Sequence, residues 1–256
     1  MMTALNTQVL ARAQSGMRRA LASRLHRRAL TVAPVQPLVS FSFDDAPSSA
    51  FDTGARVLEH HGVRGTYYVS LGLMGQPGPS GRLGGIEELR ASVAAGHELG
   101  CHTHDHLDAW QVRPGEFLAS VEANSRALQR ILPGEHFETF AYPKSGAVAA
   151  VKPALAQRFL ACRHGGQRGN NGRVDRDLLA ACFLDRQQHA DLSFVRHLLE
   201  DNARKRGWLI FATHDVAADP SPWGCTPGLL EAVVRHALRT GSRILPVREA
   251  LRAAHG

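Results

Sequence analysis

The chain has 256 residues, of which 44% are hydrophobic and 21% are charged, and this balance excludes an intrinsically disordered protein. No apolar run approaches the roughly 18 residues that a membrane span needs, and the four cysteines contain no CxxC pair that would suggest a disulfide or zinc framework. Because the N-terminus also lacks the continuous apolar segment of a signal peptide, we expect a cytoplasmic protein.

Much of the net charge of +7 lies in the segment RRALASRLHRR at 18–28. We interpret residues 1–35 as a basic leader that is helical or partly ordered, followed by one catalytic domain at 36–256. A solvated helix or frayed tail explains the leader, and weak contact with an anionic membrane surface is the alternative. No aromatic residues interleave with these arginines and no nucleic-acid-binding module is recognisable, so nucleic acid is not an expected partner.

Beyond residue 36 the chain alternates strand-like and helix-like segments. Strands are predicted at 37–43, 65–70, 97–104, 138–143, 160–166, 208–215 and 242–247. Helices are predicted at 50–62, 86–96, 115–132, 147–159, 191–207 and 228–241, with a short helix at the C-terminus, while 178–185 fits either type. This alternation favours an α/β fold with a parallel sheet, either a (β/α) barrel or an open, doubly wound sheet.

Both architectures place functional groups at the carboxyl ends of the strands, and the most polar motifs of the sequence lie there. Asp44 and Asp45 end the first strand, and the third strand runs into CHTHDH at 101–106. Tyr142 ends the fourth strand, and His214 ends the strand WLIFAT. The sequence therefore predicts one functional site at a single rim of the sheet.

The motif CHTHDH offers imidazole ligands for a metal ion. His102 and His106 are four residues apart, which would place both rings on one side of a helical turn. With an aspartate from a neighbouring strand they would form the two-histidine, one-carboxylate set of many catalytic metal sites. Exposed histidines in a polar loop are the alternative for this motif alone, and the aspartate pair at a neighbouring strand end favours the metal site.

The pair Asp44 and Asp45 places two like charges at the end of a buried strand. If one carboxylate binds a metal ion, its charge is neutralised, and the other remains as a general base for water whose pKa the ion lowers. A helix N-cap followed by a first-turn acid would explain one aspartate but not the second. His214, at the same rim, suits a general acid, with a hydrogen-bonded core histidine as the alternative.

The motifs FSFDD, HTHDH, FAYPKSG and LIFATHD, in this order, resemble the polysaccharide deacetylases, also called carbohydrate esterase family 4 or the chitooligosaccharide deacetylase homology domain. The resemblance extends from about residue 37 to the C-terminus. It implies a distorted, TIM-like (β/α) barrel of about seven parallel strands that removes acetyl groups from sugars with a divalent metal ion, usually zinc. By motif, it makes Asp44 the catalytic base, Asp45, His102 and His106 the metal ligands, the N–H of Tyr142 an oxyanion donor and His214 the acid.

The sequence departs from the family pattern beside these motifs. Ala46 follows the aspartate pair where the family usually has glycine, which changes the turn next to the base. The motif arginine that pairs with the base is missing, and Arg163 is the candidate replacement, with a solvated surface arginine as the alternative. Asp185 and Asp175 are the two alternatives for the aspartate that would partner His214.

The sequence thus predicts a metal-dependent carbohydrate deacetylase that acts on an amide bond other than a peptide bond, with an acetylated saccharide precursor as substrate. A hydrolase of a small non-sugar amide and a non-catalytic, carbohydrate-binding member of the fold are the alternatives. Lys144 adds positive charge near the expected substrate. Trp223 offers an aromatic surface for a sugar ring or, alternatively, an anchor for its loop.

Overall fold

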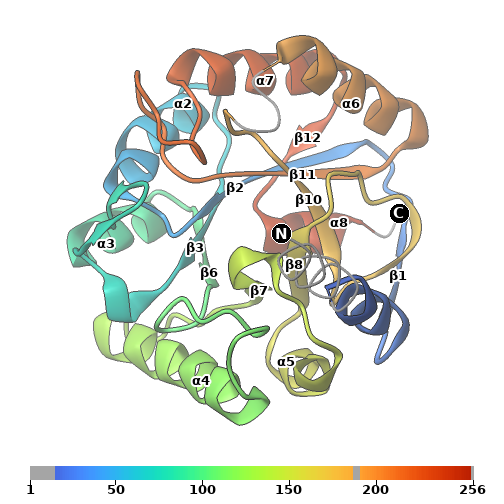
Figure 1. Cartoon of the computed structure of the whole chain (residues 1–256). Coiled ribbons are helices and arrows are strands. Elements are labelled where there is room, and N and C mark those ends of the chain that lie inside the picture. The colour runs from blue at the N-terminus through green and yellow to red at the C-terminus, as the bar shows by residue number, and fades with distance from the viewer. Residues whose placement is uncertain (1–14, 187–190, 255–256) are drawn as a thin grey trace, which may run out of the picture.

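The computed structural model describes residues 15–186 and 191–254, in which parallel strands close into a barrel (Figure 1). In order around the barrel the strands are β2 (Leu38–Asp44), β3 (Thr66–Val69), β6 (Glu98–Cys101), β7 (Thr139–Ala141), β8 (Ala161–Gly165), β10 (Leu179–Phe183) and β11 (Trp208–Thr213). β11 pairs with β2 from Leu38↔Trp208 to Phe43↔Thr213 and closes the ring. The predicted barrel is confirmed, and the alternative of an open sheet is wrong.

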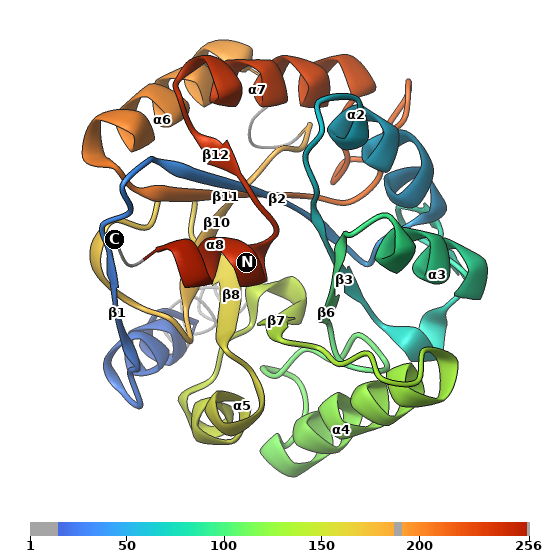
Figure 2. The same ribbon diagram turned by 180° about the vertical axis from the view of Figure 1, so that it is seen from behind.

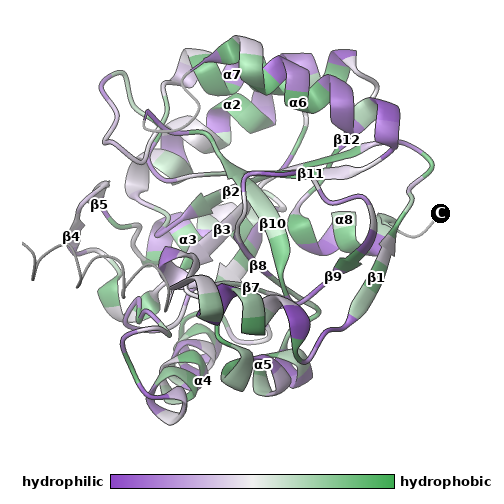
Figure 3. Ribbon diagram, turned by 45° about the vertical axis from the view of Figure 1, so that its right-hand side comes forward, coloured by the Kyte–Doolittle hydropathy of each residue, from purple (hydrophilic) through white to green (hydrophobic). Residues whose placement is uncertain are grey.

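Helices surround the barrel or cover one end of it. They are α2 (Ala55–His60), α3 (Ile86–Ala94), α4 (Pro114–Ile131), α5 (Lys152–Arg158), α6 (Leu192–Lys205), α7 (Pro227–Arg239) and α8 (Val247–Ala253). Hydrophobic and hydrophilic stretches alternate along α6 and α7, as expected for helices that pack one side on the barrel (Figure 3). Prolines occupy the first turns of α4 and α7, where the missing N–H breaks no helical hydrogen bond.

Short elements connect these layers. They are β1 (Ala29–Val32), η1 (Ala50–Gly54), η2 (Leu71–Leu73), β4 (Pro77–Gly78), β5 (Gly81–Arg82), η3 (Pro143–Ser145), η4 (Ala149–Val151), β9 (Gly172–Asp175) and β12 (Arg243–Ile244). β1 and β9 form an antiparallel pair outside the barrel, which the sequence analysis missed because strands of four residues are too short for a clear periodicity. The ambiguous segment 178–185 contains β10, a strand buried on both sides.

The C-terminal segment closes the amino ends of the strands, where α8 lies across the ring (Figure 2). Glu98, at the start of β6, is fully buried and accepts hydrogen bonds from Thr66 Oγ1, Thr139 Oγ1 and the N–H of Arg248 in α8. Burial raises the pKa of the Glu98 carboxyl, although these donors oppose the shift. One carboxyl group thus ties three elements together at the end of the barrel away from the polar rim.

A buried lysine fixes the described part of the basic leader to the barrel. Residues 15–24 are helical. Lys152 Nζ donates hydrogen bonds to the carbonyl oxygens of Ala22 (2.7 Å) and Leu25 (2.9 Å) and pairs with Asp175 Oδ2 at 2.6 Å. Because Lys152 is completely buried, these partners satisfy all three of its donors, and the leader helix is held against the barrel.

Replacing Lys152 with methionine should lower the free energy of unfolding by about 3 kcal/mol, because Asp175 is then left as an unpaired buried charge. Urea unfolding measures this loss. Lys205→Met is the matched control, since Lys205 pairs with Asp201 at the exposed surface of α6, where such a pair contributes about 0.5 kcal/mol. Equal losses in the two variants would contradict the buried clamp.

His164, in β8, should also make the folded protein less stable in acid. Burial, together with the nearby positive charges of Arg168, Arg163 and Lys152, lowers the pKa of His164 to about 4 from its ordinary 6.5. Below pH 6.5 His164 is therefore protonated in the unfolded chain but stays neutral in the folded chain. The free energy of unfolding consequently falls as the pH falls toward 4. His164→Leu should remove about 2 kcal/mol of this loss at pH 4.5, measured by urea unfolding against pH. Identical pH slopes in the wild type and the variant would rule out this contribution.

Candidate active site

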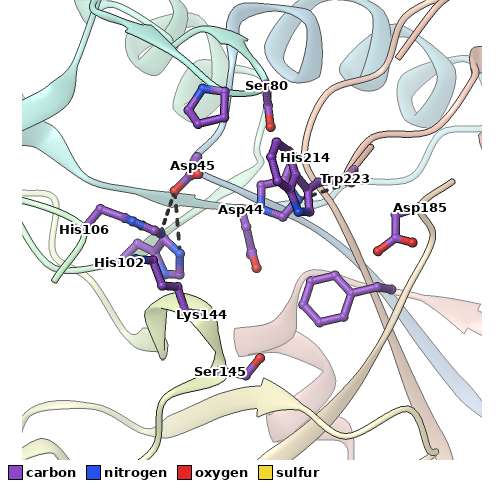
Figure 4. A pocket seen from close by; sticks show the side chains of 12 residues that line it. Asp44, Asp45, Ser80, His102, His106, Lys144, Ser145, Asp185, His214 and Trp223 are labelled. Atoms are coloured by element: carbon purple, nitrogen blue, oxygen red, sulfur yellow. Dashed lines mark hydrogen bonds and ion pairs between the residues drawn. The ribbon is translucent and has the colours of Figure 1, made fainter. Parts of the chain in front are cut away.

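A cavity of about 460 Å³ opens at the carboxyl ends of the barrel strands (Figure 4). Its lining combines carboxylates, imidazoles and hydroxyl groups with two aromatic rings. The lining residues are Asp44, Asp45, Pro79, Ser80, His102, His106, Lys144, Ser145, Phe183, Asp185, His214 and Trp223. All three predicted metal ligands, the predicted base and the predicted acid are among them. The rim predicted from the strand ends is therefore a single site.

The turn after β2 separates the two adjacent aspartates. Asp45 has φ +58° and Ala46 has φ +45°, a left-handed conformation that is uncommon for residues other than glycine. The carbonyl oxygen of Ala46 accepts a hydrogen bond from the N–H of Gly84 at 3.0 Å, which holds the turn. Ala46 thus adopts the backbone conformation that the family's usual glycine reaches without strain, and the two carboxylates enter different surroundings.

Asp45, His102 and His106 form the candidate metal centre. Asp45 Oδ1 lies 3.2 Å from His106 Nε2 and 3.8 Å from His102 Nε2, and the three ligand atoms all lie within 4.8 Å of one another. Ligand atoms that each lie about 2.0–2.2 Å from one zinc ion would be separated from one another by distances similar to those between these three atoms. Figure 4 shows the carboxylate, from the end of β2, and both imidazoles, from the loop after β6, pointing toward one another.

The predicted helical turn between the two histidines is wrong. The segment after β6 is an irregular loop in which Thr103 (φ +61°) and His106 (φ +52°) are left-handed. Thr103 Oγ1 accepts a hydrogen bond from the N–H of Leu107 at 2.9 Å and stabilises the loop. His104, between the ligands, instead contacts Asp105 through Nδ1 at 2.8 Å. The two ligands meet because the loop doubles back, and not through helical spacing.

The surroundings of His102 prepare it as a metal ligand. Its Nδ1 lies 2.8 Å from the carbonyl oxygen of Ala141, so Nδ1–H donates and Nε2 keeps its lone pair toward Asp45. Burial and the neighbouring His106 lower the pKa of His102 to about 3, against the opposing effect of Asp45. The ring is therefore neutral at physiological pH, which is the form that binds metal. This donor set fits a divalent cation.

Asp44 is paired with Arg163 inside the barrel. Arg163 Nη2 donates to Asp44 Oδ1, and the two residues are 1% and 5% exposed. The guanidinium also lies over the ring of Tyr68, 4.5 Å from its centroid. Burial lowers the pKa of Arg163 to about 9, which leaves it charged at neutral pH. The alternative of a solvated arginine is wrong, and this residue from β8 occupies the place predicted for the missing motif arginine.

His214 follows β11 on the opposite side of Asp44 from the metal ligands (Figure 4). Its Nδ1 lies 3.3 Å from the carbonyl oxygen of Trp223, and Phe183 stacks on its ring with centroids 6.4 Å apart. Burial lowers the pKa of His214, while Asp45 and the Trp223 carbonyl oppose the shift. Asp175 binds Lys152 outside the site and is excluded as a partner, whereas Asp185 lines the same cavity.

The prediction for Tyr142 is wrong in position. Its N–H donates to the carbonyl oxygen of Arg163 at 3.0 Å, as part of the pairing between neighbouring strand ends. Its ring is buried against Phe140, with centroids 5.1 Å apart, and the residue does not line the cavity. Lys144 and Ser145, in the turn that follows, line the cavity instead. The amide of Tyr142 is therefore engaged and cannot also face an oxyanion.

Several lining residues were missed in the sequence. Ser80 and Pro79 come from the β4–β5 hairpin within a glycine- and proline-rich loop that gives no functional signal. Phe183 ends β10, and an unambiguous strand assignment for 178–185 would have revealed it.

Asp215 anchors the loop that carries Trp223. Its carboxylate accepts hydrogen bonds from the N–H of Ser221 (2.8 Å) and from the Ser221 hydroxyl (2.5 Å).

Comparison with known proteins confirms the resemblance that the motifs suggested. The family model described as polysaccharide deacetylase matches residues 31–158, which is half of the chain, so the chain belongs to the polysaccharide deacetylase family. A gellan lyase from Bacillus sp is 29% identical over 104 residues. This match covers 41% of the chain and only 4% of that much longer protein.

Solved structures show the same fold at low identity. The chitin deacetylase from the fungal pathogen Colletotrichum lindemuthianum is 18% identical with a TM-score of 0.62, covering 85% of this chain and 89% of that one. A family 4 acetyl xylan esterase from Clostridium thermocellum, in complex with a cobalt ion, is 19% identical with a TM-score of 0.58. That match covers 84% of this chain and 90% of the esterase.

If these three residues bind a metal ion, replacing His102 and replacing the nearby His104 should have different effects on the metal content. Purified wild-type protein should hold about one divalent ion per chain, as a three-ligand catalytic site does. His102→Ala should lose the ion, because one of three protein ligands is gone, whereas His104→Ala should keep it. Elemental analysis after dialysis and calorimetric titration with zinc measure both. Equal metal content in the two variants would contradict this ligand set.

Proposed function

We propose that the protein is a divalent-metal-dependent deacetylase that hydrolyses the acetamide group of an N-acetylated saccharide. The observation that carries the proposal is that two neighbouring aspartates of one cavity have different partners. Asp45 faces two imidazoles that fit a cation, while its neighbour Asp44 is held by Arg163. Acyl transfer to water needs these two functions, an electrophilic centre and a general base, within reach of one substrate.

The metal ligands would be Asp45, His102 and His106, with zinc as the proposed ion because two neutral imidazoles and one carboxylate suit it. When bound, such an ion supplies Lewis acidity to a carbonyl oxygen and to water. Three protein ligands leave room in the coordination sphere for small molecules, which is typical of a catalytic site and not of a structural one.

Asp44 is proposed as the general base that accepts a proton from the attacking water. Arg163 fixes one carboxylate oxygen of Asp44, which leaves the other oxygen to take up the proton. Because both residues are buried, the pair has a defined geometry that a solvated carboxylate would lack. Arg163 is thus a positioning residue, supplied by β8 in place of the family's motif arginine.

His214 is proposed as the acid that protonates the leaving amine. The Trp223 carbonyl oxygen accepts from Nδ1–H and thereby directs Nε2 away from the loop. The burial that lowers the pKa of His214 makes its protonated form a stronger acid. Asp44 ends β2 and His214 directly follows β11, and these two strands are paired, so one residue can take a proton while the other gives one to the same tetrahedral centre.

Aromatic and cationic groups in the cavity support a saccharide as the substrate. Trp223, which is 40% exposed, and Phe183 both line the cavity and offer flat apolar surfaces to the CH faces of a sugar ring. Lys144 lines the cavity with no ion pair or hydrogen bond to any described residue, which leaves it to bind oxygen atoms of the substrate.

The four cysteines are free and buried, which supports a cytoplasmic precursor as the substrate.

Two other functions remain as outcomes of a substrate assay. A hydrolase of a small non-sugar amide would use the same acid, base and metal ligands but would not need the aromatic surfaces. A non-catalytic carbohydrate-binding protein would not need Asp44, paired with Arg163, beside the candidate metal ligands. Acetate release from a panel of N-acetylated sugars, O-acetylated sugars and simple acetamides separates the three.

Replacing Asp44 with asparagine should lower acetate release about 1,000-fold while leaving the metal content unchanged, because the variant removes the base and keeps the ligands. Kinetics on the best substrate of the panel, with elemental analysis of the same sample, measure both. Asp52→Asn is the matched control, since Asp52 lies at the exposed surface and, among the described residues, forms an ion pair with Arg56 alone. Activity of Asp44→Asn within tenfold of wild type would overturn the assignment of the base.

A further inference from the structure

The leader helix carries an exposed row of apolar side chains. Met17, Leu21 and Leu25 are 60%, 45% and 45% exposed. They are spaced four residues apart, and the helical hydrogen bond from the N–H of Leu25 to the carbonyl oxygen of Leu21 (2.9 Å) extends this geometry to the end of the row. The three side chains therefore lie along one side of the helix, facing solvent.

Other residues of the same helix are fixed to the protein. Ala22 is 1% exposed, and Lys152 binds the carbonyl oxygens of the last turn. Arg18 donates from Nη1 to the carbonyl oxygen of Trp110 at 3.0 Å, and Arg19 lies 5.4 Å from the Trp110 ring centroid. The helix is thus held on two sides, and the apolar row cannot turn inward without breaking these contacts.

Arginines without acidic partners surround the C-terminal end of this helix. Arg24 and Arg27 come from the leader, and Arg168 and Arg173 come from the segment before and within β9. None of their side chains forms an ion pair or hydrogen bond with a described residue. By contrast, Arg28 is already paired with the buried Asp177.

Three of these arginines line one cavity of about 380 Å³ beside the helix. Arg27, Arg168 and Arg173 lie in its wall together with Asn171. The acidic residue in the lining is Asp175, and its carboxylate is already bound by Lys152 and by backbone N–H groups. The cavity therefore presents uncompensated positive charge and planar guanidinium donors, which suit phosphate oxygens.

We propose that this face, made of Met17, Leu21 and Leu25 with the arginines at 24, 27, 168 and 173, docks the protein on an anionic lipid surface. The apolar row would enter the boundary between headgroups and acyl chains while the basic cavity binds lipid phosphates. In the described part of the chain, no helix has the length and hydropathy to cross a bilayer. In the proposed complex, the described part of the leader helix lies along the membrane plane.

The combination favours lipid over other occupants of this face. A nucleic acid would match the arginines but not an adjacent row of exposed aliphatic side chains, and the ring of Trp110, beside the helix, is already contacted by Arg18 and Arg19. A second copy of the chain would cover the apolar row but would bring the same unpaired positive charges together. An anionic membrane surface satisfies both the apolar row and the positive charge.

Co-sedimentation of the full chain with vesicles tests the proposal. Wild-type protein should bind vesicles of phosphatidylcholine mixed with phosphatidylglycerol, release at high salt, and bind vesicles of phosphatidylcholine alone at least about tenfold more weakly. The triple variant Met17→Ser, Leu21→Ser, Leu25→Ser and the triple variant Arg27→Ala, Arg168→Ala, Arg173→Ala should each weaken binding at least about tenfold. Both should keep wild-type turnover of a soluble substrate, which separates this test from that of the proposed activity.

A control variant removes the same charge from other faces. Arg113, Arg130 and Arg235 are exposed arginines without ion pairs among the described residues, and their joint replacement by alanine should leave vesicle binding unchanged. An equal loss in this control, or no wild-type binding to the anionic vesicles at low salt, would overturn the proposal. So would sedimentation equilibrium that shows a dimer abolished by the serine variant, since a second copy would then be the occupant of the face.

Discussion

The pairing of β2 with β11 is the constraint on which the site depends. Its register places Phe43 opposite Thr213, so Asp44, the last residue of β2, and His214, the first residue after β11, lie at the same level. The same pairing closes the barrel and brings the carboxyl ends of all seven strands to one rim. A slip by one residue would turn every β2 side chain to the other face of the sheet and would take Asp44 away from Arg163. The proposed acid and base are thus fixed relative to each other by backbone hydrogen bonds and not by loops.

The second organising feature is the separation of two neighbouring carboxylates into different environments. Asp44 remains in the barrel interior beside a buried guanidinium, whereas the left-handed backbone at Asp45 turns its carboxylate toward two imidazoles. Two like charges at a buried strand end are tolerated because each has its own positive or metal-binding partner. Pairs of titratable groups with unlike surroundings are the usual basis for distinct catalytic roles. The paired aspartates are therefore explained by two partners that arrive from other strands.

Much of this could be predicted from the sequence because the barrel has a simple rule: polar residues after buried strands meet at one rim. That rule located Asp44, Asp45 and His214 and favoured the barrel or its open relative. It could not reveal that the N–H of Tyr142 is engaged by Arg163, because strand partners are not written in local sequence. It also gave the wrong conformation between the metal-binding histidines, where left-handed residues replace helical spacing. The β1–β9 pair was missed since it depends on contacts between segments about 140 residues apart, which no local pattern encodes.

The central claim is that one carboxylate and two imidazoles from different strands share a single cation beside the Arg163-bound aspartate. Crystals soaked in zinc and measured on both sides of the zinc absorption edge test it most directly. The account predicts one anomalous peak with Asp45 Oδ1, His102 Nε2 and His106 Nε2 each at about 2.0–2.2 Å. A peak elsewhere in the cavity, or one that lacks either imidazole or the Asp45 oxygen within bonding distance, would contradict it.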